Sequence, residues 1–121
     1  MKLRIKGNSL RLRVTQSDVS QLMKDGRVEE TIQFAPVSDA RLTYALIVRD
    51  AVCDLQLEYR DQTVTVILSP AAARRWAESE DVGVYAEGTV GLMVEKDFAC
   101  LDRNDSQDAD AFPNPKAGVV C

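Results

Sequence analysis

The sequence contains no histidine among its 121 residues. Histidine is the usual general base near neutral pH and a frequent ligand of zinc and iron. Its absence excludes Ser-His and Cys-His nucleophile pairs, HExxH zinc sites and iron sites held by two histidines. Any chemistry would therefore depend on carboxylates, lysine, arginine, tyrosine, hydroxyl groups or cysteine.

Cysteine is also scarce, and no apolar run is long. Cys53, Cys100 and Cys121 show no CxxC spacing, so neither a disulfide scaffold nor a zinc ribbon is indicated. The apolar stretches span only a few residues, whereas a helix that crosses a bilayer needs roughly 20. A charge at every second residue from Met1 to Lys6 interrupts what would be the apolar region of a secretory signal. We expect a cytoplasmic protein with no membrane contact, no cofactor and no bound metal.

The charge balance limits the class of partner. The formal net charge is −4, which argues against nucleic acid as the partner. Hydrophobic residues make up 45% and charged residues 28% of the chain, as in an ordinary globular protein. A chain of this length fits one domain that buries a working core.

Hydrophobic periodicity divides the first half into four strands and a helix. Gly7-Asn8 is a favourable two-residue turn between the first two strands. Thr15 followed by Asp18 resembles a capping box, and Gly26 supplies a stop for the helix that begins there. Alternating apolar residues predict strands over residues 3–5, 10–14, 28–34 and 42–48.

The second half repeats this pattern at an offset of about 54 residues. Asp61-Gln62 stands in the place of the first turn, Ser69-Pro70 starts the second helix, and Val82 aligns with Val28. We interpret the pattern as an ancient duplication, with pseudo-repeats at residues 1–50 and 55–98.

The predicted architecture is a single α+β domain over residues 1–121. Two ββαββ repeats form a curved or barrel-like antiparallel sheet of about eight strands with two helices, followed by an irregular tail at residues 99–121. The residues on the apolar phase of each element should be buried: Leu3, Ile5, Leu10, Leu12, Val14, Leu22, Leu42, Tyr44, Leu46, Leu57, Val64, Val66, Trp76, Val82, Leu92 and Val94.

Motifs at the two ends of the sequence carry a family resemblance. KGNSxRLRxT occupies residues 6–15, EKDFxCL residues 95–101, and FPNP residues 112–115. Together they resemble a family of short bacterial conserved proteins of unknown function, over nearly the whole chain. The resemblance implies no activity, because none is assigned to that family.

Four cationic residues should share one face of the first hairpin. With a two-residue turn, Arg4 lies opposite Arg11 and Lys2 opposite Arg13. Like charges in direct cross-strand contact are destabilising, so the face should either bind an anion through its guanidinium groups or be balanced and solvated. The candidate balancing carboxylates on adjacent strands are Glu29, Glu30 and Glu58.

A second constellation would form only if the sheet closed around a polar tunnel. Gln56-x-Glu58-x-Arg60 is similar to the alternating charged strand of the triphosphate tunnel enzymes, although that family has an acid where Gln56 stands. The opening Lys-x-Arg-x-Lys strand is also opposite in sign to that of the family. The candidate tunnel residues are Arg41, Glu58, Arg60, Glu87 and Glu95.

An acidic stretch follows the last predicted strand. Asp102, Asn104, Ser106, Asp108 and Asp110 place a side-chain oxygen at every second position, as at the start of a calcium-binding loop. The loop lacks the glycine and the distal glutamate of that motif, so a solvated acidic loop is the favoured interpretation.

Three hypotheses for function remain. The first is a non-enzymatic intracellular binding or assembly module that accepts an anionic ligand or an acidic protein partner on its polar sheet face. The second is a metal-dependent phosphohydrolase of the triphosphate-tunnel type. The third is a structural partner without a ligand. Convergence of the arginine and glutamate side chains in a cavity would favour the enzyme, and a solvated face would favour the module.

Overall fold

The computed structural model describes residues 1–98, so the predicted tail lies outside the described residues. In chain order the elements are β1 (Lys2–Lys6), β2 (Ser9–Val14), α1 (Gln16–Asp25), β3 (Arg27–Gln33), β4 (Arg41–Val48), β5 (Leu55–Arg60), β6 (Thr63–Leu68), α2 (Pro70–Glu78), β7 (Gly83–Ala86) and β8 (Gly91–Lys96). The predicted α+β class, with two ββαββ units, is confirmed.

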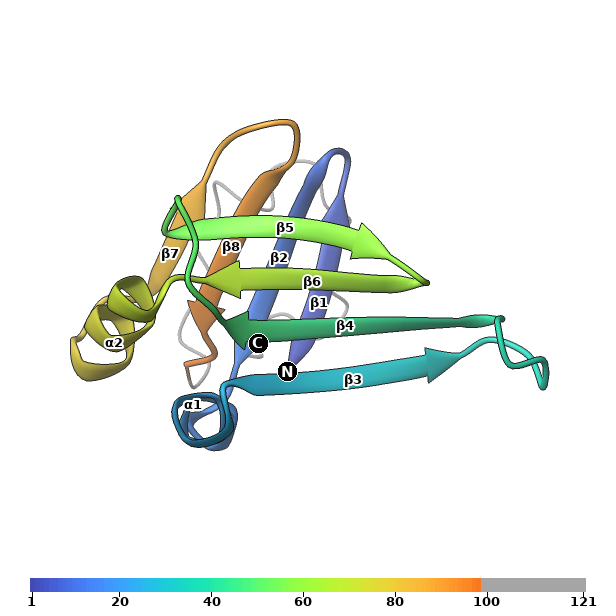
Figure 1. Cartoon of the computed structure of the whole chain (residues 1–121), viewed down its shortest axis with the longest axis horizontal. Helices are drawn as coiled ribbons and strands as arrows, with labels where there is room; N and C mark the ends of the chain where they lie inside the picture. The colour runs from blue at the N-terminus through green and yellow to red at the C-terminus, as the bar shows by residue number, and fades with distance from the viewer. Residues whose placement is uncertain (99–121) are drawn as a thin grey trace, which may run out of the picture.

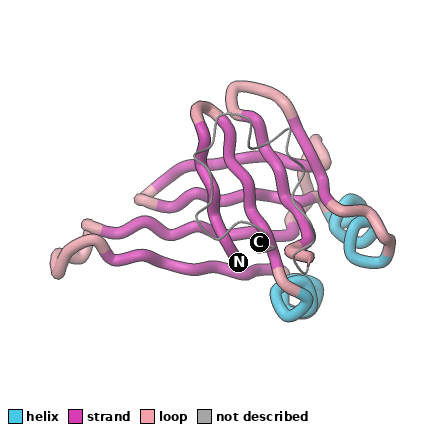
Figure 2. The backbone as a smooth tube through the Cα atoms, turned by 180° about the vertical axis from the view of Figure 1, so that it is seen from behind, coloured by secondary structure: helices cyan, strands magenta, loops and turns pink. Residues whose placement is uncertain are grey.

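The eight strands form two four-stranded sheets that pack face to face. Sheet A has the order β1-β2-β8-β7, and sheet B has the order β3-β4-β6-β5. The strands of sheet B run across those of sheet A, and both helices lie at the same side of the pair (Figures 1 and 2). The sheets do not close into a barrel, so the apolar layer between them takes the place of an interior channel.

Each sheet combines one hairpin from each half of the chain. The hairpins are antiparallel, but the two central strands run parallel, β2 beside β8 in sheet A and β4 beside β6 in sheet B. The sequence pattern predicted the hairpins and not the parallel pairs. Alternation of apolar and polar residues shows which face of a strand is buried. It does not show whether a strand from a distant part of the chain pairs parallel or antiparallel.

Local signals in the sequence set the turns and the helix ends as predicted. Gly7 has a φ of 54°, which glycine adopts without steric cost, and the β1–β2 register closes around Gly7-Asn8. The Asp18 backbone N–H donates to Thr15 Oγ1, and the Thr15 N–H donates to Asp18 Oδ2, which completes the capping box of α1. Gly26 ends α1 in the left-handed region, and Ser69 caps α2.

The core lies between the sheets and against the helices. Most of the predicted core residues are buried or half-buried. The prediction was wrong for Ile5 and Val82, since 61% and 48% of their surfaces are exposed. Ile5 is next to the β1–β2 turn, at the far end of its strand. Val82 precedes β7, and its carbonyl accepts hydrogen bonds from Trp76 Nε1 and from the Lys96 backbone.

Corresponding backbone contacts recur in the two ββαββ units. The Val48 N–H donates to Gly26, and the Lys96 N–H donates to Val82. Val28 pairs with Leu46 on the neighbouring strand, and Val84 pairs with Val94. The structural counterpart of Val28 is therefore Val84 and not Val82, because the link between α2 and β7 is longer than the link between α1 and β3.

The connection from β4 to β5 has to cross β6, which lies between those two strands in sheet B. Residues 49–54 cross the end of β6 (Figure 1). Hydrogen bonds from Arg49 N–H to Leu68 and from Ser69 N–H to Asp54 hold this connection. Ile67, beside the crossing, is fully buried although it belongs to the outer face of sheet B.

Candidate functional site

The predicted cationic residues lie together on the outer face of sheet A. Lys2 pairs with Arg13 and Arg4 with Arg11, as the two-residue turn predicts. Leu10, Leu12 and Val14 point the other way and are buried, so the alternation of β2 fixes the outward direction of its arginines. The outward cations of β1 and β2 are called the cationic face: Lys2, Arg4, Lys6, Arg11 and Arg13.

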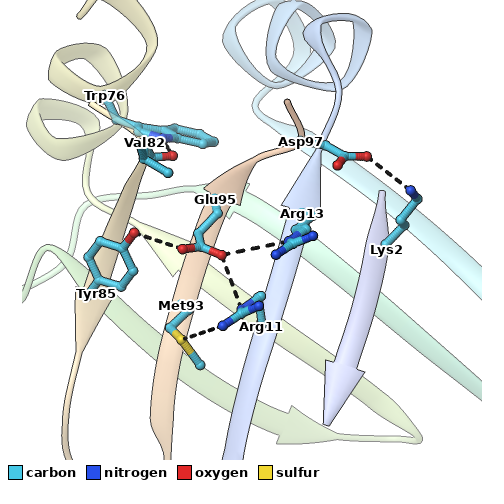
Figure 3. Close-up of polar contacts among 9 residues, drawn as sticks. All are labelled: Lys2, Arg11, Arg13, Trp76, Val82, Tyr85, Met93, Glu95 and Asp97. Atoms are coloured by element: carbon cyan, nitrogen blue, oxygen red, sulfur yellow. Dashed lines mark hydrogen bonds and ion pairs between the residues drawn. The ribbon is translucent and has the colours of Figure 1, made fainter. Parts of the chain in front are cut away.

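Glu95 on β8 forms ion pairs with two arginines of this face. The parallel register sets Glu95 beside Arg13 and Met93 beside Arg11. Glu95 Oε1 lies 3.2 Å from Arg11 Nε and 3.8 Å from Arg13 Nε (Figure 3). One carboxylate therefore balances two guanidinium groups on the neighbouring strand.

Tyr85 and Met93, both in sheet A, hold the side chains of Glu95 and Arg11 in place. Tyr85 Oη donates a 2.9 Å hydrogen bond to Glu95 Oε2, and Arg11 Nη2 donates to Met93 Sδ over 3.7 Å (Figure 3). Arg11 Nε is buried and makes no hydrogen bond of good geometry, so its contact with Glu95 is an ion pair. Burial raises the pKa of Tyr85, and the adjacent Glu95 carboxylate raises it further.

A second ion pair involves β1, at the edge of the sheet. Lys2 Nζ is 3.1 Å from Asp97 Oδ2, immediately after β8 (Figure 3). With Glu95 and Asp97 included, five cations meet two carboxylates, which leaves a local charge of +3 on a chain whose formal net charge is −4. Within residues 1–98, no carboxylate forms an ion pair with Arg4 or Lys6.

The carboxylates named from the sequence as neighbours have other partners. Glu29 pairs with Arg27 at 2.7 Å, and Glu58 pairs with Arg49 at 3.0 Å. Glu30 lies 3.1 Å from the ammonium group of Met1. All three residues belong to sheet B. The sequence did not predict that Glu95 balances the arginines. Its strand, β8, lies beside β2 through a parallel pairing of segments that are far apart in the chain.

The structure does not bring the candidate tunnel residues together. Glu58 and Arg60 lie on the outer face of sheet B, whereas Glu95 lies on the outer face of sheet A, with the apolar core between them. Arg41 begins β4 and donates to the Ser38 carbonyl, and Glu87 is exposed in the β7–β8 link. No group of three potential metal ligands occurs in the described part of the chain.

Among the described residues, two cavities are lined by none of the cations of the face. One of about 340 Å³ lies between β5 and the β7–β8 link and is lined by Leu55, Leu57, Val90 and Leu92 among others. Another of about 360 Å³ lies at the start of α1, against Ala77 of α2 and Lys96 of β8. Neither is lined by an arginine. The cationic face is thus a surface that can bind negative charge, without a described cavity that encloses a small substrate.

Within residues 1–98, neither α1 nor α2 has the length and apolar character needed to span a bilayer.

Comparisons with known proteins agree with the resemblance at the two ends of the chain. A search of the curated proteins and a search of the solved structures each found no match. A family model described as "Family of unknown function (DUF7009)" matches residues 1–116. The expectation of a family without an assigned function is confirmed to that extent. Because the match covers nearly the whole sequence, the chain belongs to this family.

Proposed function

We propose that the protein is a non-enzymatic binding module that holds an acidic polypeptide segment on its cationic face. The observation that carries the proposal is the excess of positive charge on one sheet face, with Arg4 opposite Arg11 and Lys2 opposite Arg13. Such like-charge pairs are destabilising in an isolated sheet. Glu95 and Asp97 balance part of this charge, and an acidic partner would balance the rest.

The spacing of the cations favours an extended chain of carboxylates over a small anion. Arg11 and Arg13 are two residues apart on β2, which sets their α-carbons about 6.6–6.8 Å apart. Alternate side chains of an extended peptide have the same spacing. A phosphate group contacts one or two guanidinium groups closely, and without an enclosing pocket it would leave the remaining cations unpaired.

The phosphohydrolase alternative has less support. It needs arginines for the phosphates and carboxylates for a metal around one cavity. Glu58 and Glu95 lie on opposite outer faces, and Glu58 is already paired with Arg49. Nothing in the described arrangement favours this activity over the binding module.

Binding of a fluorescent oligo-aspartate peptide, followed by anisotropy, tests the proposal. Arg4→Gln should weaken binding about 3- to 10-fold, because it removes a charge-assisted contact without breaking an ion pair among residues 1–98. The matched control is Arg60→Gln, which makes the same charge change on the outer face of sheet B and should alter binding less than about 2-fold.

Two outcomes would contradict this function. Equal losses in the two variants would mean that overall charge, and not the cationic face, attracts the peptide. Tighter binding of inorganic triphosphate than of oligo-aspartate would contradict the acidic polypeptide as the partner. Specific binding should also weaken with added salt, since charges are screened over about 8–10 Å at physiological ionic strength.

We also propose that the two ββαββ units descend from one duplicated unit and that the module acts in the cytoplasm. The recurring hydrogen bonds and the equivalent pairs Leu12–Val94 and Val66–Leu46 support the duplication. An alignment of family members in which these positions vary independently of one another would argue against it. Cell fractionation tests the location.

A further inference from the structure

The chain leaves β8 in the direction of the cationic face. The Asp97 backbone N–H donates to the Val14 carbonyl at the end of β2, over 2.8 Å. The Asp97 carboxylate reaches Lys2 on β1, the strand beyond β2 (Figure 3). Asp97 therefore lies across the end of β2, on the side where the arginines point.

The same contact occurs at the equivalent place in sheet B. The Arg49 N–H donates to the Leu68 carbonyl over 3.0 Å, as the Asp97 N–H does to Val14 in sheet A. From Arg49 the connection 49–54 crosses the end of β6 and enters β5, the outer neighbour of β6 (Figure 1). Asp97 and Arg49 therefore hold equivalent places, at the ends of β2 and β6.

The sequence that follows is complementary in charge to this surface. Residues 102–110 contain four aspartates and one cation, Arg103, which gives a net charge of −3 against +3 on the face with its two carboxylates. Asp108 and Asp110 are two positions apart, as are Arg11 and Arg13. These residues are the acidic segment: Asp102, Asp105, Asp108 and Asp110 with the residues between them.

The tether is long enough for the acidic segment to cover the face. Asp102 is four residues from Phe98, so it can lie at most about 14 Å away, and Asp110 at most about 43 Å. A strand of six residues such as β2 is about 20 Å long. Every cation of the face is therefore within reach of some aspartate of the segment.

We propose that the acidic segment, residues 102–110, occupies the cationic face of its own chain, so that an acidic partner must displace it. This proposal rests on the proposed function of the face. A tethered competitor acts at a high effective concentration and lowers the apparent affinity for a free partner without changing the face itself. The segment would select partners whose negative charge exceeds its own.

Zero-length cross-linking tests the occupancy in the full chain. A carbodiimide joins a lysine ammonium group and a carboxylate in direct contact as an amide, with loss of water. Mass spectrometry should find Lys2 or Lys6 joined to aspartates of the acidic segment. The Lys2–Asp97 pair at 3.1 Å is the internal positive control, and Lys24 on α1 is the negative control. Cross-links from Lys2 to Asp97 without any to the segment would overturn the proposal.

Binding of oligo-aspartate tests the competition. Full-length protein with Asp102, Asp105, Asp108 and Asp110 changed to Asn should bind the peptide about 10-fold more tightly than the unmodified protein. The control makes the same charge change at exposed acids elsewhere and should alter affinity less than about 3-fold: Asp39→Asn, Asp50→Asn, Glu80→Gln and Asp81→Asn.

The two measurements separate failure of this inference from failure of the proposed function. Equal affinities of the segment variant and its control, with measurable binding, would overturn the competition and leave the binding function standing. If neither variant binds the peptide, the binding function fails, and the cross-links alone decide whether the segment occupies the face.

Discussion

At the scale of single residues, Glu95 determines how the cationic face is organised. Its carboxylate contacts Arg11 and Arg13 and accepts a hydrogen bond from the Tyr85 hydroxyl, so three side chains from β2 and β7 depend on one residue of β8. A half-buried residue with several charged partners contributes more than an exposed ion pair, because water competes less for its contacts. We therefore expect substitutions at Glu95 to have larger effects than those at the surrounding cations.

Glu95→Gln should lower the free energy of unfolding by about 1–2 kcal/mol, since it leaves two arginines without their carboxylate. It should also lower the pKa of Tyr85 toward its ordinary value of 10.0, because burial would then act without the nearby negative charge. Urea unfolding and an alkaline absorbance titration measure the two effects.

Tyr85→Phe is the matched control for this change, since it removes the hydroxyl hydrogen bond and leaves both ion pairs intact. It should lower the free energy of unfolding by less than Glu95→Gln does. A larger loss from Tyr85→Phe would mean that the hydrogen bond, and not the ion pairs, holds Glu95 in place.

At the scale of elements, the capping box of α1 should make stability depend on acid pH. Burial raises the pKa of Asp18, but hydrogen bonds from the Thr15 backbone, the Met1 ammonium group and the Thr15 hydroxyl outweigh it and lower the pKa below its ordinary value of 3.8. A carboxyl group with a lowered folded-state pKa stabilises the protein above its unfolded pKa. That contribution is lost as the pH falls through the folded-state value.

Asp18→Asn should therefore reduce the free energy of unfolding by about 1 kcal/mol at neutral pH, with a difference that shrinks under acid conditions. Asp25→Asn, in the last turn of the same helix, is the control and should be neutral or slightly stabilising. Urea titrations at several pH values measure both. A difference between Asp18→Asn and the unmodified protein that stays constant down to acid pH would contradict the role of the ionised carboxylate.

The elements also show which parts of the fold the sequence predicts. The hairpin turn at Gly7-Asn8 and the cap at Thr15 depend on neighbours in the chain, so their residues predict them directly. The parallel pairs depend on segments far apart, and alternation carries no such information. One signal was available, because Ala45 to Val48 and Val66 to Leu68 are continuous apolar runs, which are typical of central parallel strands.

The candidate site divides in the same way. The register of Lys2 with Arg13 and of Arg4 with Arg11 follows from one local turn, and the sequence predicts it. The position of Glu95 beside Arg13 follows from the β2–β8 pairing, which joins the two halves of the chain. The sequence therefore predicts the charge of the face but not the residue that balances it.

At the scale of the whole molecule, the two ββαββ units are interlocked. Sheet A takes β1 and β2 from the first unit and β7 and β8 from the second, and sheet B is also built from both units. A central strand that unfolded with its own unit would leave its parallel neighbour in the other unit without hydrogen-bond partners. Neither half has a sheet or a core of its own, so we expect residues 1–98 to unfold as a single cooperative unit.

Leu12→Ala and Leu46→Ala test this expectation, because each removes a fully buried side chain from the centre of a different sheet. Each should lower the free energy of unfolding by about 2–5 kcal/mol through lost burial and the cavity left behind. Val52→Ala, at a position that is 99% exposed, should change it by less than about 0.5 kcal/mol. In both core variants the urea transition followed by Trp76 fluorescence should coincide with that followed by far-ultraviolet circular dichroism. Trp76 belongs to α2 in the second unit, so a Leu12→Ala protein in which the dichroism falls before the fluorescence would show that the first unit unfolds alone.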